Sequence, residues 1–437
     1  MPHHAAGESI GAITGRCTCN ACSQVKVLTD EASQPTALKR PRAAPPLAVP
    51  RRLLGFSCRH VVGPMVGASD LAFRLLCRRH GADTCYTEML FSSRLVDDPS
   101  YRARKLRTCA EDRPLIVQLQ GSEPAQVGAA AALVEATCAC DAIDLNLGCP
   151  LPQAHEERFG AFLLDREHWP TVAACIQAMV HATALPICAK IRLLPSVDET
   201  IDLVRMLHTA GCAMVAVHGR RRPPIGQHRG ERLKQSADLD AVRQVCAACG
   251  RAGGCSGANG NAAGDGQGAM DDGRLHVLTN GNTQLASDVS ANLAHTHADG
   301  LMAAEGVLRN PRLFKHAAAH SAPSSTDCPH FGARALVDGM AVSGALSLER
   351  SPPSLELSRD DVGSIALEYL ALARDEEISV VRSHVMWLLG KSGKGERCRF
   401  EWLGPFSDVQ LRMALVGAES VDELEGLVRA VLGLATV

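Results

Sequence analysis

The sequence predicts an α/β fold, a closed (β/α)8 TIM barrel followed by a small C-terminal helical domain. Eight short apolar runs recur between residues 60 and 306 with helix-like segments between them, the alternation expected of parallel strands joined by crossover helices. Polar or reactive residues fall late in several runs, where such a barrel builds its active site. After residue 358, apolar residues repeat at i, i+4, i+7 spacing, which predicts helices.

Length and composition are typical of a globular protein with a large core. The chain has 437 residues, 46% of them apolar and 21% charged. Lys and Arg (45) nearly balance Asp and Glu (47), so a polyanion would need a local basic patch to bind. No uncharged apolar run approaches the ~18 residues of a membrane span, and we expect no membrane partner.

The cysteines indicate the compartment. Eighteen of them are scattered along a long chain instead of framing a small loop-rich domain, and we recognise no signal peptide pattern. Reduced thiols are therefore expected, and we predict a cytoplasmic location, with a nuclear pool left open. The cysteine clusters at 17–22 and 246–249 each lack the four well-spaced ligands of a structural zinc site, so we expect no metal.

Three polar stretches divide the chain. Residues 1–50 contain six prolines and no aromatic residue, so we expect a disordered arm. Residues 250–273 hold nine glycines and are expected to form a loop insertion within a barrel that spans 51–316. Residues 317–354, rich in Ser, Pro and Ala, would link the barrel to a helical domain at 355–437.

The predicted strands place their polar residues at one end of the barrel. In chain order, the strands are expected at residues 60–66, 84–90, 115–120, 142–148, 187–192, 214–219, 276–281 and 300–306. The late polar positions are Gln118, Asn146, Lys190, His218 and Asn280. A purely structural strand has little use for Lys or His at its end, so we predict a site where these strands end.

A cysteine follows the fourth predicted strand in the segment 144–150, DLNLGCP. Gly148 and Pro150 favour a sharp loop that can present the Cys149 thiol to a cleft. Most cysteines are small buried hydrophobic residues, which is the alternative interpretation. Its place at the expected mouth of the barrel favours a chemical role for Cys149.

Other strand ends suggest a site for an anionic or electron-rich cofactor. Lys190 and His218 would point into the same mouth, although each alone could be a strand-end ion pair or a structural histidine. Asn280-Gly281-Asn282 and Ala304-Glu305-Gly306 follow the last two strands, where barrels commonly bind phosphate through backbone N–H groups. Either tripeptide alone is an ordinary turn.

Several motifs occur in a fixed order along the chain. They are HVVGPMV at 60–66, RLLCRRHGADTCYTEML at 74–90, DRPLIVQL at 112–119, DAIDLNLGCP at 141–150, AGCAMVAVHGR at 210–220 and LMAAEGVLRNPRLF at 301–314. In these motifs the chain resembles the tRNA-dihydrouridine synthases, flavoenzymes that reduce uridine in tRNA. The resemblance covers about residues 56–316 and, more weakly, 366–388. It is greatest to the eukaryotic branch that modifies uridines 16 and 17 of the D-loop.

The resemblance implies an FMN-dependent enzyme that uses NADPH or NADH to reduce the C5=C6 bond of a D-loop uridine, with tRNA bound by the helical domain of a monomer. The residues implied to contact the cofactor are Pro64, Met65, Val66, Gln118, Lys190, His218, Asn280, Gly281, Asn282, Ala304 and Glu305. Those implied to contact the substrate are Asn146, Arg192 and Arg220. Cys149 matches the catalytic cysteine, whose neutral thiol can give a proton to C5 while reduced flavin gives a hydride to C6.

Two alternative functions stay open at this point. One is another FMN barrel oxidoreductase, similar to dihydroorotate dehydrogenase, that acts on a free pyrimidine. The other is a non-catalytic tRNA-binding paralogue, which is conceivable because the loop 151–158, LPQAHEER, departs from the glutamine and basic residues usual in the family.

Overall fold

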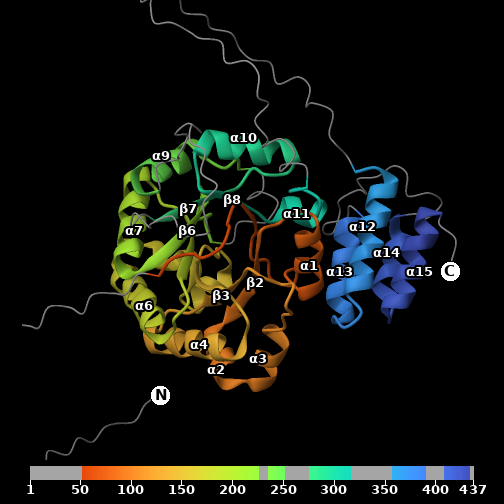
Figure 1. The fold of residues 1–437 in the computed structure, drawn as a ribbon, viewed down its shortest axis with the longest axis horizontal. Coiled ribbons are helices and arrows are strands. Elements are labelled where there is room, and N and C mark those ends of the chain that lie inside the picture. Colours follow the sequence, from red (N-terminus) through yellow and green to blue (C-terminus); the bar gives the residue numbers. More distant parts are fainter. Residues whose placement is uncertain (1–51, 226–234, 251–274, 316–356, 390–407, 434–437) are drawn as a thin grey trace, which may run out of the picture. The chain divides into compact units, whose positions relative to one another are not determined.

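The barrel predicted from the sequence is confirmed. The computed structural model describes residues 52–225, 235–250, 275–315, 357–389 and 408–433, all within the compact unit Ala48–Val437. Eight parallel strands form a closed barrel in the order β1 to β8, and helices surround it (Figure 1). The strands are β1 (His60–Val62), β2 (Thr84–Phe91), β3 (Leu115–Gln120), β4 (Ala142–Leu147), β5 (Ile187–Leu193), β6 (Cys212–Arg221), β7 (His276–Asn280) and β8 (Gly300–Ala303).

Helices connect successive strands on the outside of the barrel. The longer ones are α1 (Leu71–Arg79), α4 (Pro124–Thr137), α6 (Trp169–Ala182), α7 (Val197–Ala210), α9 (Leu239–Cys249) and α10 (Ala286–Thr296). Shorter ones are α2 (Ser92–Asp97), α3 (Pro99–Lys105), α5 (Pro152–Glu156), α11 (Glu305–Arg309) and the 3-10 turns Gly160–Leu164 and Arg166–His168. Local sequence sets their starts, as where Ser196 and Glu199 form a capping box at α7.

Each predicted strand is present, but two of them, β1 and β8, end three or more residues earlier than expected. β1 stops at Val62, and Pro64, which has no N–H to donate to a ladder, follows two residues later. β8 stops at Ala303 because the chain turns into helix α11 at Glu305. The residues beyond these strands therefore lie outside the sheet, 63–66 in a loop and 305–306 at the start of α11.

The barrel interior is filled by alternate residues of the strands, as expected for a barrel of this size. The deeper interior cluster is formed by Cys58, Val61, Tyr86, Ile116, Ala142, Cys188, Met214, Ala216, Leu278 and Met302. The polar side chains of Gln118 and Asp144, both fully buried, lie on the same alternation in β3 and β4. Gln118 and Asp144 thus lie next to the apolar cluster that fills the deeper barrel interior.

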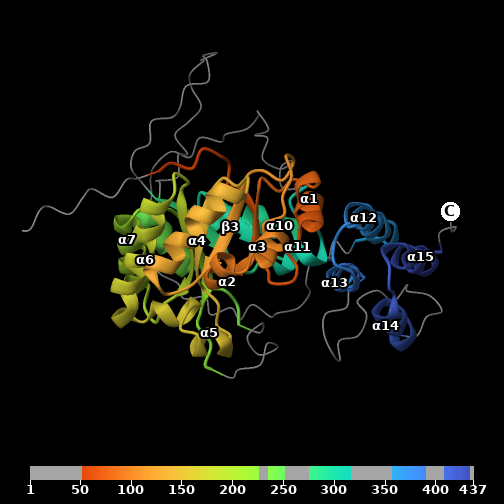
Figure 2. The ribbon, with the colours of Figure 1, turned by 90° about the horizontal axis from the view of Figure 1, so that it is seen from below.

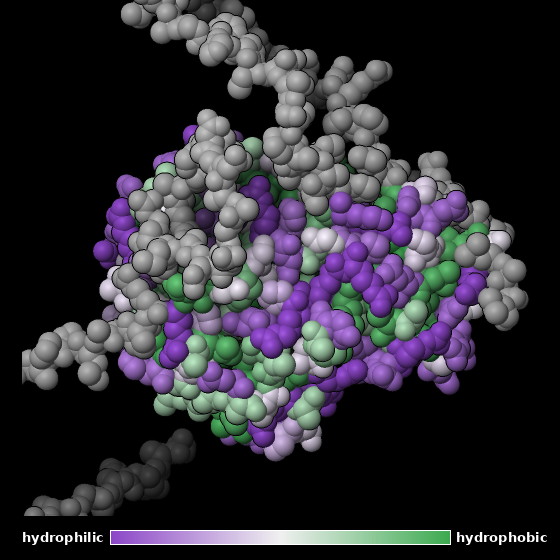
Figure 3. Space-filling view, viewed as in Figure 1, coloured by the Kyte–Doolittle hydropathy of each residue, from purple (hydrophilic) through white to green (hydrophobic). Residues whose placement is uncertain are grey.

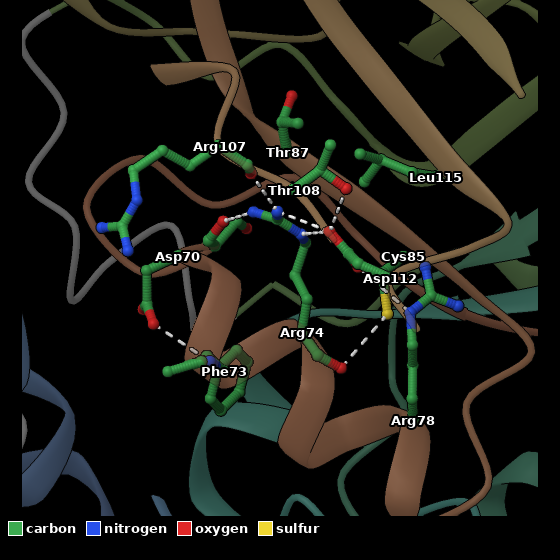
Figure 4. Close-up of polar contacts among 12 residues, drawn as sticks. Asp70, Phe73, Arg74, Arg78, Cys85, Thr87, Arg107, Thr108, Asp112 and Leu115 are labelled. Atoms are coloured by element: carbon green, nitrogen blue, oxygen red, sulfur yellow. Dashed lines mark hydrogen bonds and ion pairs between the residues drawn. The ribbon is translucent and has the colours of Figure 1, made fainter. Parts of the chain in front are cut away.

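A buried ion network fixes α1 to the loop before β3 (Figure 4). Nε and Nη2 of Arg74 donate to Asp112 Oδ2 at 2.9 and 2.6 Å, and Arg78 Nε donates to Asp112 Oδ1 at 3.1 Å. Thr108 adds a hydroxyl donor at 3.2 Å. Because Arg74, Arg78 and Asp112 belong to the motifs at 74–90 and 112–119, part of those motifs serves the fold.

The C-terminal helices predicted after residue 358 are confirmed. They are α12 (Arg359–Leu372), α13 (Ile378–Leu388), α14 (Asp408–Gly417) and α15 (Val421–Leu432). α12 and α13 pack on α1, where the Phe73 ring stacks on His384 at 4.5 Å between centroids. His384 Nε2 lies 2.5 Å from Asp70 Oδ2, and Arg107 Nη1 donates to Glu376 at 2.9 Å.

Other parts of the predicted organisation lie outside the described residues. These are the arm at 1–50 with its cysteine cluster, the linker at 317–354, and the insertion at 250–273 except for Gly250, which follows α9. Within the described ranges, no helix is long and apolar enough to cross a membrane. Hydrophilic side chains are spread over both the barrel and the C-terminal helices on the face shown in Figure 3.

Candidate active site

A pocket of about 740 Å³ opens where strands β4 to β8 end. This volume lies within the ~300–1,000 Å³ common for cofactor and ligand sites. The predicted site residues in its lining are Cys149, Arg192, His218, Arg220, Asn280, Gly281, Asn282, Ala304 and Glu305. Strand register explains why they meet, since Arg192 pairs with His218, and His218 with Asn280, on adjacent strands.

The Cys149 loop is held by hydrogen bonds to the ends of its own strand and of the next one. Asn146 Oδ1 accepts the backbone N–H groups of Gly148 and Cys149 at 3.1 and 3.0 Å. Arg192 Nε, on β5, donates to Gly148 O at 2.7 Å. The cysteine is partly exposed at the pocket, and α5, which follows it, lies beyond the same end of the barrel (Figure 2).

Gly160 packs against the Cys149 loop at a position where only glycine fits. Its φ is +66°, and a Cβ at this position would lie 2.8 Å from Cys149 O and 2.9 Å from Cys149 Cβ. Gly67 has a similar φ of +74° but faces open space, so it carries the backbone restriction without the contact.

We expect Gly160→Ala to displace the Cys149 loop. Both Gly160→Ala and the control Gly67→Ala lose about 1–2 kcal/mol from the left-handed backbone. The clash with Cys149 should cost Gly160→Ala about 1–3 kcal/mol more in the free energy of unfolding, measured with urea. Only Gly160→Ala should also change the rate at which iodoacetamide alkylates Cys149. Equal effects of the two substitutions would contradict the contact.

His218 is held neutral by its surroundings. Arg220 Nη1 lies 3.1 Å from His218 Nε2, and because a guanidinium only donates, this nitrogen must accept. Burial, followed by the positive charges of Lys190 and Arg192, holds the pKa of His218 well below its usual range. The imidazole therefore carries its proton on Nδ1 and is available as a neutral donor.

Arg220 was predicted to contact substrate, but much of its guanidinium is committed to the protein. Besides the contact with His218, Nη2 donates to Asn282 Oδ1 at 3.1 Å and Nε donates to Gln235 O at 2.5 Å. Asn282, at φ +52°, is in turn tied to Ala237 N at 2.8 Å. Arg220 thus orients His218 and the loop after β7, and its contact with substrate stays a prediction.

Lys190 lies two residues before Arg192, on the same face of β5, and is largely buried. Burial lowers the pKa of Lys190 to about 8, with the charge of Arg192 acting in the same direction and the Asp144 carboxylate opposing it. The Lys190 side chain therefore provides a positive charge next to the pocket at pH values below about 8. An electron-rich ligand ring placed over it would be stabilised.

Several predicted cofactor contacts do not line the pocket. Pro64, Met65 and Val66 form the loop between β1 and α1, in which Val66 is 67% exposed. Gln118 is fully buried and bonded to Asp144 and Asn146. The roles assigned to these residues stay predictions.

The structure adds residues that the sequence did not identify. Arg309 joins Arg192, Arg220 and Arg221 in the described lining, against the single carboxylate of Glu305. Arg309 ends α11, so its place beside the phosphate-type loops depends on how the chain folds after β8. Asp144 is the second such residue and lies in the DLNLGCP segment. Its position two residues before Asn146, on the same face of β4, is the sequence feature that could have indicated a role beside Asn146.

The pocket suits an anionic ligand better than a metal ion. In the described part of the chain, no group of three or more His, Cys, Asp or Glu side chains is placed to hold a metal. Four arginines, together with the loops 280–283 and 303–305, line the pocket, and arginine is well suited to binding anionic groups such as phosphate. Their chemistry and the pocket volume fit a phosphate-bearing cofactor.

Fold and site define a (β/α)8-barrel protein with a basic ligand pocket and a loop cysteine at its mouth. A family model described as dihydrouridine synthase (Dus) matches residues 60–260 and 270–337. The chain belongs to this family, and the resemblance stated from its motifs is confirmed.

Curated relatives carry more specific names. The chain is 40% identical over 266 residues to a Rattus norvegicus protein named tRNA-dihydrouridine(16/17) synthase [NAD(P)(+)]-like, a match that covers 60% of this chain and 53% of the relative. It is 33% identical over 258 residues to the Schizosaccharomyces pombe tRNA-dihydrouridine(16/17) synthase [NAD(P)(+)], covering 59% and 57%. A Saccharomyces cerevisiae tRNA-dihydrouridine(20a/20b) synthase is 32% identical over 260 residues, covering 58% and 61%. The chain thus spans about half the length of the first of these relatives.

Proposed function

We propose that this protein is an FMN-dependent tRNA-dihydrouridine synthase that uses NADPH or NADH and acts on D-loop uridines 16 and 17. The observation that carries the proposal is Cys149, held on a fixed loop at the rim of a basic pocket in a chain of the dihydrouridine synthase family. The relatives named for positions 16/17 reach 40% identity, against 32% for the Saccharomyces cerevisiae relative named for 20a/20b.

Different residues of the site would bind the cofactor and donate the proton. His218, Lys190 and the loops 280–282 and 304–305 would hold the cofactor. The bound cofactor, once reduced by NADPH or NADH, supplies the hydride for C6 of uracil. Cys149 would hold a proton opposite C5, and the hydrogen bonds to the Gly148–Cys149 backbone keep its thiol at the pocket.

RNA binding would use the positive charge around the pocket. A target base must leave its stack to reach Cys149, at a cost of a few kcal/mol that phosphate contacts elsewhere offset. Arg221 and Arg309 provide such charge at the rim, and the C-terminal helices would extend the contact surface. A monomer located in the cytoplasm, with a nuclear pool, completes the proposal.

One assay tests the proposal against both alternatives. Purified full-length protein is incubated with unmodified tRNA and NADPH, and dihydrouridine is then measured by mass spectrometry. We expect a yellow protein with an absorbance band near ~450 nm that forms dihydrouridine. A yellow protein that reduces only a free pyrimidine would support the dihydroorotate dehydrogenase-like alternative. A colourless protein that binds tRNA and cannot be reconstituted with FMN would support the non-catalytic one.

Lys190 should make FMN binding depend on pH. Since its pKa lies at about 8, the ammonium is charged below that pH and loses its proton above it. We expect FMN affinity to fall by up to about tenfold per pH unit above about pH 8. Fluorescence titrations of apoprotein check this, with Lys190→Arg, which stays charged, as the control that removes the fall. The same fall in Lys190→Arg would place its origin elsewhere.

A further inference from the structure

A continuous chain of side-chain hydrogen bonds runs from the barrel interior to the Cys149 loop. Gln118 Nε2 donates to Asp144 Oδ1 at 2.8 Å, and Asn146 Nδ2 donates to Gln118 Oε1 at 2.8 Å. Asn146 Oδ1 then accepts the backbone N–H of Cys149 at 3.0 Å. Asp144 is fully buried at the inner end, where the Tyr86 hydroxyl also donates to it at 3.4 Å.

The direction of this chain depends on its inner end. A primary amide can present either its oxygen or its nitrogen to a neighbour, so Gln118 and Asn146 have no intrinsic orientation. A carboxylate only accepts, and Asp144 therefore draws the nitrogen of Gln118 toward itself. Gln118 Oε1 must then face Asn146, which offers its nitrogen and turns its oxygen toward the loop.

We propose that Asp144 is a positioning residue that sets the orientation of Gln118 and Asn146 and so fixes the loop that carries Cys149. Reversal of the chain would turn the Asn146 nitrogen toward the N–H groups of Gly148 and Cys149, where two donors would face each other. The consequence for turnover rests on the proposed function of Cys149, whereas the consequence for the loop does not.

The charge of Asp144 supports this role near neutral pH and above. Burial raises the pKa of the Asp144 carboxyl to about 7, while the hydrogen bond from Gln118 and the charge of Lys190 lower it. Tyr86 on β2 also faces it, and the Cys188 and Cys212 thiols interact with its charge. At pH 8 the carboxylate form therefore predominates, and the test is placed at that pH.

The test exchanges the carboxylate and the amide at the two ends of the Asp144–Gln118–Asn146 hydrogen-bond chain. Asn146→Asp puts a second acceptor opposite Gln118, which can then satisfy only one carboxylate. The double variant Asp144→Asn with Asn146→Asp allows the reversed chain, in which residue 144 donates to Gln118, Gln118 donates to residue 146, and residue 146 still accepts the loop N–H groups. A simple structural role of either residue would make the double variant worse than both single variants.

The readout is amide hydrogen exchange of Gly148 and Cys149 in the full-length protein at pH 8, which needs neither tRNA nor NADPH. In Asn146→Asp the side chain at 146 loses the hydrogen bond to Gln118 that holds it in place, and we expect exchange of the loop amides to speed up by about tenfold. Asp144→Asn should speed exchange less, and the double variant should return toward the wild-type rate. Double-variant exchange as fast as that of Asn146→Asp, or faster, would overturn the proposal.

Two further measurements complete the design. Thr279→Val is the matched control, since Thr279 is buried in β7 and its hydroxyl has no hydrogen-bond partner in the described structure. Its exchange at Gly148 and Cys149 should equal that of wild type. Wild-type dihydrouridine formation is measured in parallel. An inactive protein with the expected exchange pattern would refute the proposed function alone, and an active protein without that pattern would refute the positioning role alone.

Discussion

Replacement of Cys149 by alanine is expected to lower dihydrouridine formation by about 10²–10⁴-fold while FMN content and NADPH oxidation stay near wild type. The thiol lines the pocket and is partly exposed, so its loss removes a proton donor without opening a cavity in the core. The defect should therefore lie in the half-reaction that consumes uridine. Flavin absorbance, NADPH consumption and dihydrouridine per flavoprotein measure the three quantities separately.

A structural role for Cys149 would give a different pattern. Stability and FMN retention would then fall together, with activity per folded flavoprotein nearly unchanged. Cys109→Ala is the matched control, because Cys109 is also partly exposed but does not line the pocket. It should leave all three measurements unchanged. Normal turnover by the Cys149→Ala protein would remove the thiol from the reaction and leave the family assignment intact.

The barrel could be predicted because its signals are local. Each strand is a short apolar run, and the mouth of a closed barrel collects whatever polar residues end those runs, as Lys190, His218 and Asn280 do. Strand ends were less predictable, since β8 stops where α11 begins, which depends on how the loop packs and not on the apolar content of 300–306.

Residue roles that depend on distant partners could not be derived from the sequence. Arg220 has the residue type and position of a substrate contact, but its donors go to His218, to Asn282, which lies 62 residues away, and to the backbone of Gln235. Asp144 has no visible role until strand register places Gln118 beside it. The types of the residues at the strand ends were therefore enough to locate the site. The role of each residue within the site could be assigned only from the contacts in the folded structure.

The same distinction applies to the motif residues around Asp112. Asp112 is fully buried and pairs with two arginines, Arg74 and Arg78, which lie 38 and 34 residues before it. Arg74 is only 3% exposed. Their position in family-like motifs could suggest a functional role. The geometry instead gives them a structural one, because the pairs hold α1 against the chain entering β3 (Figure 4).

We expect Asp112→Ala to lower the free energy of unfolding by about 3–5 kcal/mol, because it leaves two arginine charges without their shared buried partner. Asp240 is a matched control, since it also contacts two basic side chains, Arg243 and His295, but is 65% exposed. Solvent screens those contacts, so Asp240→Ala should cost only about 0–1 kcal/mol. Urea unfolding at neutral pH compares the two variants. Similar midpoints would mean that the buried network is replaceable by solvent, and the motif residues would then need an explanation other than the stability of α1.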